Sequence, residues 1–513
     1  MSDMVANAVK IRLGDVLCQD IDKTGPADGE VFTYVDISSI DRDSKKITDA
    51  KEVSAGDAPS RAKQRLQAGD VLVSMTRPNL NAIAMVPPRL DQAIGSTGFH
   101  VLRSQHINPH YIFNLVKTRE FIDALCQCVQ GALYPAVRPS DIESFEFLLP
   151  PESEQQRIVA KLDELFSELD KGVENLRTAQ KQLKVYRQAL LKQAFEGKLT
   201  ADWRAQNPDK LESAEALLVR IQKEREACYQ QQLTEWREAQ QIWEAAGKIG
   251  SKPAKPRVPK VQPLLTTEEL MELPGLPEGW AWGRLGFMTC GVEYGTAAKS
   301  SETGKVAVLR MGNIQNSRFD WQDLVYTDDA DEIAKYSLRH DDVLFNRTNS
   351  PELVGKAAIY KSEQPALFAG YLIRLNQIGS IAKAQFVNLF LASHVAKQHG
   401  SKVKTDGVNQ SNINGEKLAN YPFPYCHVSE QDAVVAVLED KLSNLEKLES
   451  TITTSLQQAE ALRQSILKKA FSGQLVPQHS DDEPASVLLE RIRSERTAQQ
   501  PARKRGRKVA KPA

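Results

Sequence analysis

Two short segments that follow expected strands carry side chains able to form hydrogen bonds with nucleic-acid bases. One is FNRTNSP, from Phe345 to Pro351, and the other is the equivalent TRPNLN, from Thr76 to Asn81. Arginine can donate two hydrogen bonds to guanine, and asparagine can pair with the edge of adenine. The candidate contact residues are Asn346, Arg347, Asn349, Thr76, Arg77, Asn79 and Asn81. A turn rich in asparagine and proline has the same composition, so both interpretations stay open.

A second pair of polar loops lies further along each half of the chain. These are GVNQSN, from Gly407 to Asn412, and GALYPAVR, from Gly131 to Arg138. Their candidate contact residues are Gln410, Ser411, Asn412, Tyr134 and Arg138. Lysine contacts phosphate more often than it specifies a base, so we expect Lys402 and Lys404 to contact phosphate; Arg310 and Asn313 are further candidates. Purely structural loops explain these residues about equally well.

Motifs that carry catalysis are absent from the sequence. It contains no GxxxxGK[ST] phosphate loop, no HExxH helix, no GxSxG turn, no glycine-rich cofactor loop and no [N/D]PP[Y/F] tetrapeptide. Glu196-Gly197-Lys198 resembles part of a nuclease motif, but the equivalent Ser472 and Gln474 carry no charge. We therefore predict a chain that is not an enzyme and binds neither a metal nor a cofactor directly.

Overall composition limits the other possibilities. The chain has 513 residues, 41% of them hydrophobic, and its 66 Lys and Arg balance 66 Asp and Glu. A nucleic-acid-binding protein of this composition must concentrate its positive charge locally. The six cysteines include no CxxC pair, and Cys126-x-Cys128 is a weak metal signal, so we expect free thiols. No signal peptide or long apolar run is present, which predicts a cytoplasmic protein without membrane contact.

The sequence contains a duplication of about half its length. RLGDV at Arg12 matches RLGFM at Arg284, and the segments around Asp70 and Asp342 match at the same offset of 272. SEQQRIVAKLDEL matches SEQDAVVAVLEDKL, AFEGKL matches AFSGQL, and ESAEALLVRIQKERE matches EPASVLLERIRSER. Each period is far longer than a solenoid repeat, so a whole domain with its following helix is duplicated.

Each copy ends in a long helix with apolar residues at alternating steps of four and three, the pattern of a coiled coil. Ser153 and Ser429 are expected N-caps, and Gly197 and Gly473 are expected to end the helices. The predicted core of the first helix is Ile158, Leu162, Leu165, Leu169, Leu176, Leu183, Tyr186 and Leu190. That of the second helix is Val434, Leu438, Leu445, Leu448, Ile452, Leu462 and Ile466.

Two helices of equal length in one chain are expected to pair with each other. We predict antiparallel pairing, because it relates the two domains by a pseudo-twofold axis and duplex DNA has local twofold symmetry. The predicted fold is α+β: two α/β domains joined by two long antiparallel coiled-coil helices, with pseudo-twofold symmetry from the duplication.

The chain divides into six expected segments. These are a first globular domain at 1–150, a long helix at 151–200, a charged helical segment and proline-rich linker at 201–274, a second globular domain at 275–427, a second long helix at 428–475, and a C-terminal helix with a basic tail at 476–513.

The duplicated helix motifs resemble those of the specificity subunit of type I restriction–modification systems. LPEGWAWGRLG before the second domain and TDGVNQSNINGEKL, from Thr405 to Leu418, carry the same resemblance, which covers nearly the whole chain. It implies that each globular domain is a target recognition domain for one half of a split site in double-stranded DNA. The coiled coil would set the spacing of the half-sites, which its length suggests is roughly 34 Å.

The resemblance also implies partner proteins. Two methyltransferase subunits would dock on the coiled coil and methylate adenine with S-adenosylmethionine, and two restriction subunits would translocate and cleave DNA with ATP and Mg. The alternative is a coiled-coil scaffold whose two end domains bind proteins. That alternative leaves unexplained the polar loops at equivalent places in both domains.

Overall fold

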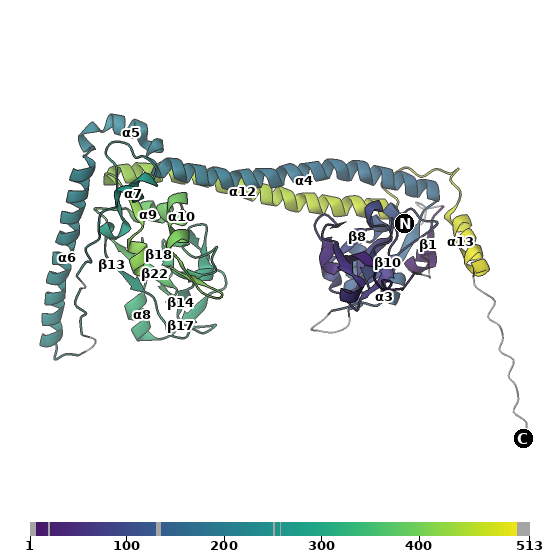
Figure 1. Ribbon diagram of the computed structural model, residues 1–513, viewed down its shortest axis with the longest axis horizontal. Coiled ribbons are helices and arrows are strands. Elements are labelled where there is room, and N and C mark those ends of the chain that lie inside the picture. The colour runs from purple at the N-terminus through teal and green to yellow at the C-terminus, as the bar shows by residue number, and fades with distance from the viewer. Residues whose placement is uncertain (1–6, 19–20, 130–134, 250–251, 257, 500–513) are drawn as a thin grey trace, which may run out of the picture. The chain divides into compact units, whose positions relative to one another are not determined.

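The structure is a computed structural model that describes residues 7–18, 21–129, 135–249, 252–256 and 258–499. The chain divides into two compact units, one formed by residues 1–178 with 452–513 and the other by residues 179–451. Each unit therefore combines parts of both sequence copies (Figure 1). No helix in the described ranges is long and apolar enough to cross a membrane.

The first unit contains a domain with several small sheets. Its strands are β1 (Val9–Arg12), β2 (Val31–Val35), β3 (Ile40–Asp41), β4 (Lys46–Ile47), β5 (Lys51–Ser54), β6 (Ala62–Arg65), β7 (Val71–Ser74), β8 (Ile83–Met85), β9 (Ile94–Ser96), β10 (Phe99–Leu102) and β11 (Glu146–Leu149). Its helices are α1 (Pro109–Leu115), α2 (Arg119–Gln127) and α3 (Pro139–Glu143). The sheet orders are β5-β2-β9-β6, β10-β7-β8, β1-β11 and β3-β4.

The second unit repeats this plan with differences in its sheets. Its strands are β12 (Ala281–Arg284), β13 (Thr289–Tyr294), β14 (Val306–Leu309), β15 (Ile314–Gln315), β16 (Arg318–Phe319), β17 (Val325–Thr327), β18 (Val343–Asn346), β19 (Thr348–Asn349), β20 (Ala357–Ile359), β21 (Ala366–Phe368), β22 (Leu372–Gln377), β23 (Thr405–Asp406), β24 (Ser411–Asn412) and β25 (Pro422–Tyr425). Its short helices are α5 (Ala201–Gln206), α7 (Thr267–Met271), α8 (Ala330–Tyr336), α9 (Ala384–Leu391), α10 (His394–Val403) and α11 (Gly415–Ala419). The sheet orders are β13-β22-β18-β20, β17-β14-β21, β19-β24-β23, β12-β25 and β15-β16.

The two long helices are α4 (Glu152–Phe195) and α12 (Val428–Phe471), each of 44 residues. Both are followed by the predicted glycines, whose φ angles of 69° at Gly197 and 72° at Gly473 lie in the left-handed region. The expected N-caps are wrong, because each helix begins one residue before its serine. Instead, the Ser153 hydroxyl donates a hydrogen bond of 2.6 Å to Asp482.

Ion pairs and a hydrogen bond inside the two units show how α4 and α12 pair. In the first unit, Arg463 pairs with Asp170, and Gln478, just past α12, donates to Glu154 at 3.4 Å. In the second unit, Arg187 of α4 lies 4.0 Å from Glu446. Arg204, which follows the end of α4 in the chain, lies 2.6 Å from Glu430. In both units the residue number rises along one segment while it falls along the other. The predicted antiparallel pairing is confirmed.

Most of the predicted coiled-coil core is buried. Ile158, Leu162, Leu190, Val434, Leu438, Leu445 and Ile452 are buried, while Leu165, Leu169, Leu176, Leu183 and Ile466 are half-buried. Leu448 and Leu462 were predicted wrongly as core, since their side chains are 52% and 51% exposed, and so was Tyr186, which is 49% exposed. Alternating steps of four and then three residues from Leu445 lead to Ile452 and later to Arg463, and they pass through neither Leu448 nor Leu462. A charged side chain therefore takes the place expected for an apolar one.

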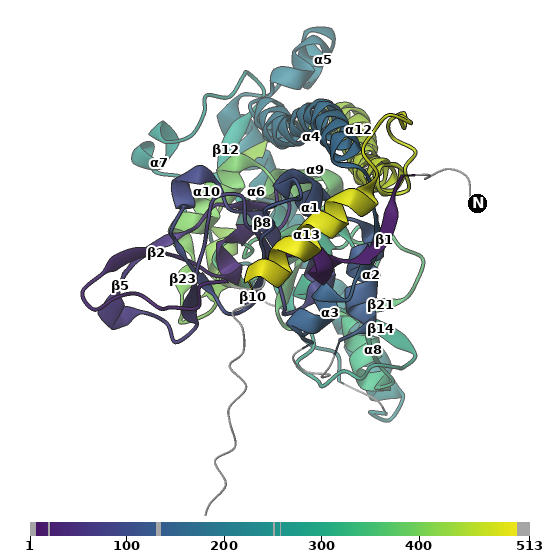
Figure 2. The ribbon, with the colours of Figure 1, turned by 90° about the vertical axis from the view of Figure 1, so that its right-hand side faces the viewer.

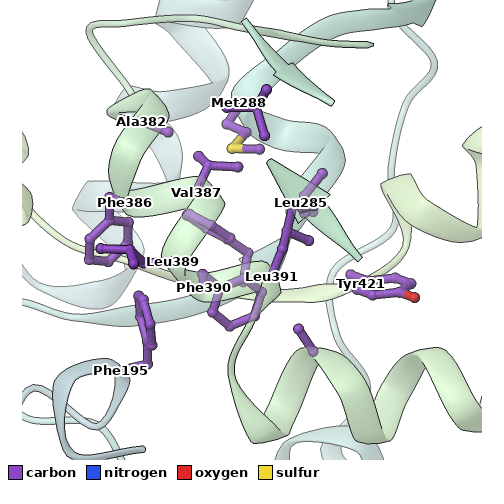
Figure 3. Packing of buried hydrophobic residues seen from close by; sticks show 14 of the residues in the cluster. Phe195, Leu285, Met288, Ala382, Phe386, Val387, Leu389, Phe390, Leu391 and Tyr421 are labelled. Carbon is purple, nitrogen blue, oxygen red and sulfur yellow. The ribbon is translucent and has the colours of Figure 1, made fainter. Parts of the chain in front are cut away.

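The core of each globular domain is completed by the helix end of the other copy. In the second unit, the Phe195 ring at the end of α4 lies 5.1 Å from Phe386 and 5.3 Å from Phe390 of α9 (Figure 3). In the first unit, Phe471 at the end of α12 lies 5.1 Å from Tyr111 of α1. The sequence repeat therefore does not coincide with the packing unit.

The helix that follows each long helix packs in the same exchanged way. Arg225 of α6 (Ala214–Ala245) donates to the carbonyl of Thr289 at 3.0 Å. In the first unit, Arg496 of α13 (Ala485–Gln499) donates to the carbonyl of Leu17, which is the repeat equivalent of Thr289. Figure 2 shows α13 lying against the first domain. Each domain is thus clamped by two consecutive helices from the other sequence copy.

The proline-rich stretch after α6 folds back along that helix. The Trp236 indole donates to the Pro253 carbonyl at 3.0 Å, Lys255 lies over the same ring, and Arg225 donates to the Lys260 carbonyl at 3.0 Å. The stretch expected to be a linker is therefore a packed part of the second unit. The basic tail at 500–513 lies outside the described residues.

Candidate nucleic-acid interface

The two polar loops predicted in the second domain meet in one small sheet. Strand β24 pairs with β19 on one side and with β23 on the other, so that Asn412 faces both Thr348 and Thr405. The Asn412 side-chain amide donates to the Thr348 hydroxyl at 2.7 Å. Loops separated by some 60 residues therefore form a continuous surface.

The first domain joins its equivalent loops through the same backbone contacts. Thr76 and Ala136 form an isolated antiparallel bridge, which corresponds to the pairing of Thr348 with Asn412. The Arg77 N–H donates to the Pro135 carbonyl at 2.8 Å, and the Val137 N–H donates to the Met75 carbonyl at 2.9 Å. The backbone scaffold of the candidate surface is thus common to both copies, while its side chains differ.

Arg347 is held over an aromatic ring. Its guanidinium lies 4.9 Å from the centre of the Tyr294 ring, a favourable cation–π geometry. The Tyr294 hydroxyl accepts a hydrogen bond of 3.0 Å from the Gly415 N–H at the start of α11. A β-carbon at Gly415 would lie 3.1 Å from that hydroxyl and 2.6 Å from Val292, so glycine permits the approach. Arg347 is therefore positioned by groups from two segments distant from its own loop, β13 and the start of α11.

The tip of the β23–β24 hairpin is open to solvent. Gln410 is exposed, and Val408 beside it is fully exposed. Ser411 is buried, and its hydroxyl donates to Asp406, a hydrogen bond that lowers the pKa of the Asp406 carboxyl. Lys404 lies 3.6 Å from the same carboxylate. The internal bonds of the hairpin leave Gln410 available for an outside partner.

Several candidate residues of the second domain have structural contacts instead. Asn346 is fully buried, and its side chain accepts from the Thr348 N–H at 3.3 Å. Asn313 is buried and donates to the carbonyls of Asp320 and Gln322. Arg310 pairs with Asp323 at 3.2 Å, Lys402 pairs with Glu272 at 2.6 Å, and the Asn349 side chain accepts from the Ser350 N–H. Of these, Asn346 and Asn313 have no exposed surface with which to contact DNA in this conformation.

In the first domain the predicted turn is conformationally unusual. Arg77 and Asn81 adopt φ angles of 49° and 44°, in the left-handed region that is costly for residues with a side chain. They bracket Pro78–Leu80, and Thr76, Arg77 and Asn79 are exposed. Arg138 is exposed on the neighbouring loop, and Tyr134 lies outside the described residues. Backbone strain in an exposed polar turn is typical of a functional site.

Two tyrosines next to these loops were missed by the sequence analysis. Besides Tyr294, Tyr371 is 49% exposed, and its carbonyl accepts from the Arg347 N–H at 3.0 Å. Tyr294 ends β13 and Tyr371 lies in the turn before β22, both far from the loop in sequence, so no local spacing linked them to Arg347. In the first domain the equivalent backbone hydrogen bond runs from the Met75 N–H to the Gly98 carbonyl. The repeat therefore links the segment of Tyr371 to the loop of Arg347.

Comparisons with known proteins agree with this architecture. Residues 9–176 and 291–458 match the family described as type I restriction modification DNA specificity domain. The specificity subunit of the EcoKI restriction enzyme from Escherichia coli K12 is 24% identical over 400 residues, covering 76% of this chain and 72% of that protein. The StySPI specificity subunit from Salmonella potsdam is 22% identical over 451 residues, covering 85% and 83%.

A solved structure has a similar fold. A chain from a study of complex assembly and conformational transition in the type I restriction–modification system is 23% identical, with a TM-score of 0.64. The similarity covers 93% of this chain and 100% of that one.

Fold and surface together define a two-domain protein whose domains present equivalent polar loops and are joined by an antiparallel coiled coil. Since the family match covers more than half of the sequence, the chain belongs to the family of type I restriction–modification DNA specificity domains. Recognition of a DNA sequence by its two domains is confirmed by this membership. Specificity subunits are the non-catalytic members of type I systems.

Proposed function

We propose that each domain recognises one half of a bipartite site in double-stranded DNA through the paired polar loops described above. The observation that carries the proposal is the equivalent backbone bridge between these loops in both domains, Thr76 to Ala136 and Thr348 to Asn412, with different side chains around it. A common scaffold with variable side chains is what two unrelated half-sites require. The exposed or half-exposed candidates are Thr76, Arg77, Asn79, Asn81, Arg138, Arg347, Asn349, Lys404, Gln410 and Asn412.

Within this set, we assign direct base contact to Arg347 and Gln410 in the second domain and to Arg77 and Asn79 in the first. All four belong to the paired loops. Arginine and the side-chain amides can form two hydrogen bonds with one base, which gives discrimination of about 1–3 kcal/mol per contact. Lys404 contributes phosphate contact, which positions the protein without specifying sequence.

Methyltransferase subunits dock on the solvent-facing sides of α4 and α12 in this proposal. Tyr186 in the second unit and Leu462 in the first occupy equivalent repeat positions and are each about half exposed, at 49% and 51%. Apolar side chains are costly to leave in water, and aromatic residues are enriched in the buried centres of interfaces. One such position on each helix supports two equivalent docking sites.

The full assembly would be cytoplasmic and contain two methyltransferase and two restriction subunits. The methyltransferases supply adenine methylation with S-adenosylmethionine, and the restriction subunits supply cleavage driven by ATP with Mg. The chain described here would bind none of these cofactors directly. Support comes from the family membership and from relatives that are subunits of type I restriction enzymes.

Exchange of one domain tests the proposal. Residues 1–150 would be replaced by the first domain of a divergent specificity subunit, and the methylated sites would be mapped in cells that also carry the methyltransferase. We expect one half of the methylated site to change and the other half to remain. Replacement of residues 275–427 serves as the matched control and should change the opposite half. An unaltered methylation pattern in both exchanges would contradict the proposal.

Salt dependence separates DNA recognition from a protein-binding scaffold. Phosphate contacts release counterions, so the affinity of the purified methyltransferase complex for its site should fall steeply as the salt concentration rises. A fluorescence anisotropy titration at several ionic strengths measures this slope. A flat response would favour the scaffold.

A further inference from the structure

A basic stretch lies along α6 of the second unit and is not part of the paired polar loops (Figure 1). It consists of residues 252–256 and 258–260, with the sequences KPAKP and VPK. Between Glu244 and Glu268 the sequence contains five lysine and arginine residues and no acidic residue. A chain whose total charges cancel therefore concentrates positive charge at this place, as a neutral DNA-binding protein must.

Two side chains of α6 hold the backbone of the basic stretch. The Trp236 indole donates to the Pro253 carbonyl at 3.0 Å, and Arg225 donates to the Lys260 carbonyl at 3.0 Å. The prolines of the stretch favour an extended conformation, because each of them fixes its own φ angle. Side chains on a backbone that is fixed in this way lose less conformational entropy when they bind a partner.

Two lysines of the basic stretch have no acidic partner. Lys252 and Lys255 are exposed, and no carboxylate in the described ranges forms an ion pair with either of them. Lys255 lies 5.6 Å from the centre of the Trp236 ring, a contact that leaves its charge in place. The α6 carboxylates at positions 226, 235 and 244 accept hydrogen bonds from glutamines of their own helix. The two ammonium groups are therefore available to an outside anion.

One end of the basic stretch lies beside the candidate recognition surface. The Lys260 ammonium lies 3.7 Å from Glu416 of α11. The residue before Glu416 is Gly415, whose N–H donates to the hydroxyl of Tyr294. The Tyr294 ring is the one that holds Arg347. The positive charge of the basic stretch is thus continuous with the surface to which we assign base contact.

The length of the basic stretch suits a run of phosphates. Its contacts with α6 are at Arg225 and Trp236, which are 11 residues apart and so separated by about 16 Å of helix. Duplex DNA advances about 3.4 Å per base pair, so this length corresponds to roughly five base pairs. We propose that the basic stretch binds the phosphates of the duplex that flanks the second half-site. The inference rests on the proposed recognition of DNA by the second domain and adds a contact that does not read sequence.

A protein partner is the competing occupant. Val258 and Val261 are 73% and 94% exposed, and exposed apolar side chains also mark protein interfaces. Lysine, however, is depleted in such interfaces and is a common phosphate contact in DNA complexes. Continuity with the recognition surface favours DNA as well.

Anisotropy titrations with the methyltransferase complex of the full chain test the proposal. Two duplexes carry the site found by methylation mapping and extend about 2 or about 12 base pairs beyond the second half-site, which leaves out or includes the flank. Lys252→Ala with Lys255→Ala should weaken binding to the longer duplex about 10-fold and leave binding to the shorter one unchanged. On the longer duplex, the slope of log affinity against log salt should also fall by about 2.

Matched variants separate phosphate contact from other effects. Lys223→Ala with Arg237→Ala removes the same charge from other sides of α6, since these residues lie about 160° and 120° around the helix from Arg225. This variant should bind both duplexes as the unsubstituted complex does. Lys252→Arg with Lys255→Arg should also keep the original affinity, because the charge is retained.

Three results would overturn the inference. One is an unchanged affinity of the variant without both lysines for the longer duplex, and another is an equal loss on both duplexes. The third is weaker methyltransferase binding of that variant in the absence of DNA, which would identify a protein partner. If the unsubstituted complex has no preference for the mapped site, the proposed function fails and the inference fails with it. If that preference is present but flank length has no effect on the variant, only the inference fails.

Discussion

Arg347 combines two features expected of a base-contacting residue. It stands on a half-exposed loop, and the Tyr294 ring limits the directions that its guanidinium can take. A side chain held in place before binding loses less conformational entropy when it contacts DNA. The neighbouring Asn346, which the sequence analysis also named as a candidate for base contact, is buried. Position in the fold therefore distinguishes two adjacent residues that can each form a pair of hydrogen bonds with a base.

Substitution of Arg347 should weaken recognition of the second half-site. Arg347→Ala removes a contact of about 1–3 kcal/mol, so specific DNA affinity should fall roughly 5- to 150-fold, with a smaller change for nonspecific DNA. Tyr294→Leu should cost about 3- to 5-fold through the lost cation–π contact, and Tyr294→Phe, which keeps the ring, should cost less. Competition binding with specific and scrambled duplexes measures these ratios. Equal losses on both duplexes would make Arg347 a phosphate contact.

Lys117 predicts a pH-dependent stability of the first unit. Its pKa falls from 10.5 to about 7 on folding, so between these pH values the unfolded chain binds a proton that the folded chain does not. Stability relative to the variant Lys117→Met should therefore rise with pH across this window, by up to about 1.4 kcal/mol per pH unit. Urea midpoints of both proteins at pH 6, 8 and 9.5 measure the difference. A difference that stays constant with pH would show that Lys117 keeps its ordinary titration.

At the scale of elements, the residues where α4 and α12 meet both hold the two helices together and specify their register. Apolar residues such as Leu162 and Leu438 form the pairing seam, and charged residues within or beside the seam, Arg187 and Arg463, pair across it with Glu446 and Asp170. Polar groups at seam positions favour one register over others, at some cost in stability. The two ion pairs occupy equivalent positions in the repeat, so the register is specified once in each unit.

The first turns of α4 and α12 are each held by an ion pair, and the two ion pairs differ in burial. Glu430 in the first turn of α12 is fully buried and accepts hydrogen bonds from Arg204 at 2.6 Å and Thr200 at 2.7 Å. Arg204→Met leaves that carboxylate buried without its cation and should destabilise the second unit by about 3 kcal/mol. The matched variant Arg157→Met, which removes the partner of the more accessible Asp482, should cost less. Thermal unfolding of the two variants makes the comparison, and the reverse order would contradict the burial argument.

At the scale of the whole molecule, neither sequence copy is a complete folding unit. The first domain is packed against Leu467, Ala470 and Leu488 of the second copy. The second domain is packed against Phe195, Leu217 and Ile221 of the first copy. Large apolar surfaces would be exposed if the copies were separated, and such surfaces drive association. Duplication within one chain therefore replaces the second subunit of a dimer.

A fragment of residues 1–250 should consequently form a homodimer. Its own helix ends can replace the missing ones, because Phe195 is the repeat equivalent of Phe471 and Leu217 that of Leu488. Analytical ultracentrifugation should show a dimer at micromolar concentration, and Phe195→Asp in the fragment should abolish it. A stable, folded monomer would show that the exchanged helices are dispensable for the domain core.

The sequence by itself determined the duplication, the two long helices with their antiparallel pairing, and the family. These depend on periodic patterns and repeated motifs, which survive in one dimension because helix contacts recur every three or four residues. The ends of α4 and α12 at Gly197 and Gly473 were likewise predictable from local preference. By contrast, the exposure of Leu448 and Leu462 depends on which residues of α12 face α4. The pattern of apolar residues along α12 alone does not show this.

The candidate recognition surface was decided only by tertiary structure. The polar loops were visible in the sequence, but their pairing through Thr348 and Asn412 requires strands far apart in the chain. So do the placement of Tyr294 beneath Arg347 and the burial of Asn346 and Asn313. The exchange of helices between copies belongs here too, because sequence similarity reveals which segments are equivalent but not which of them touch. Burial and contact are properties of three-dimensional packing, so they follow from the fold rather than from spacing along the chain.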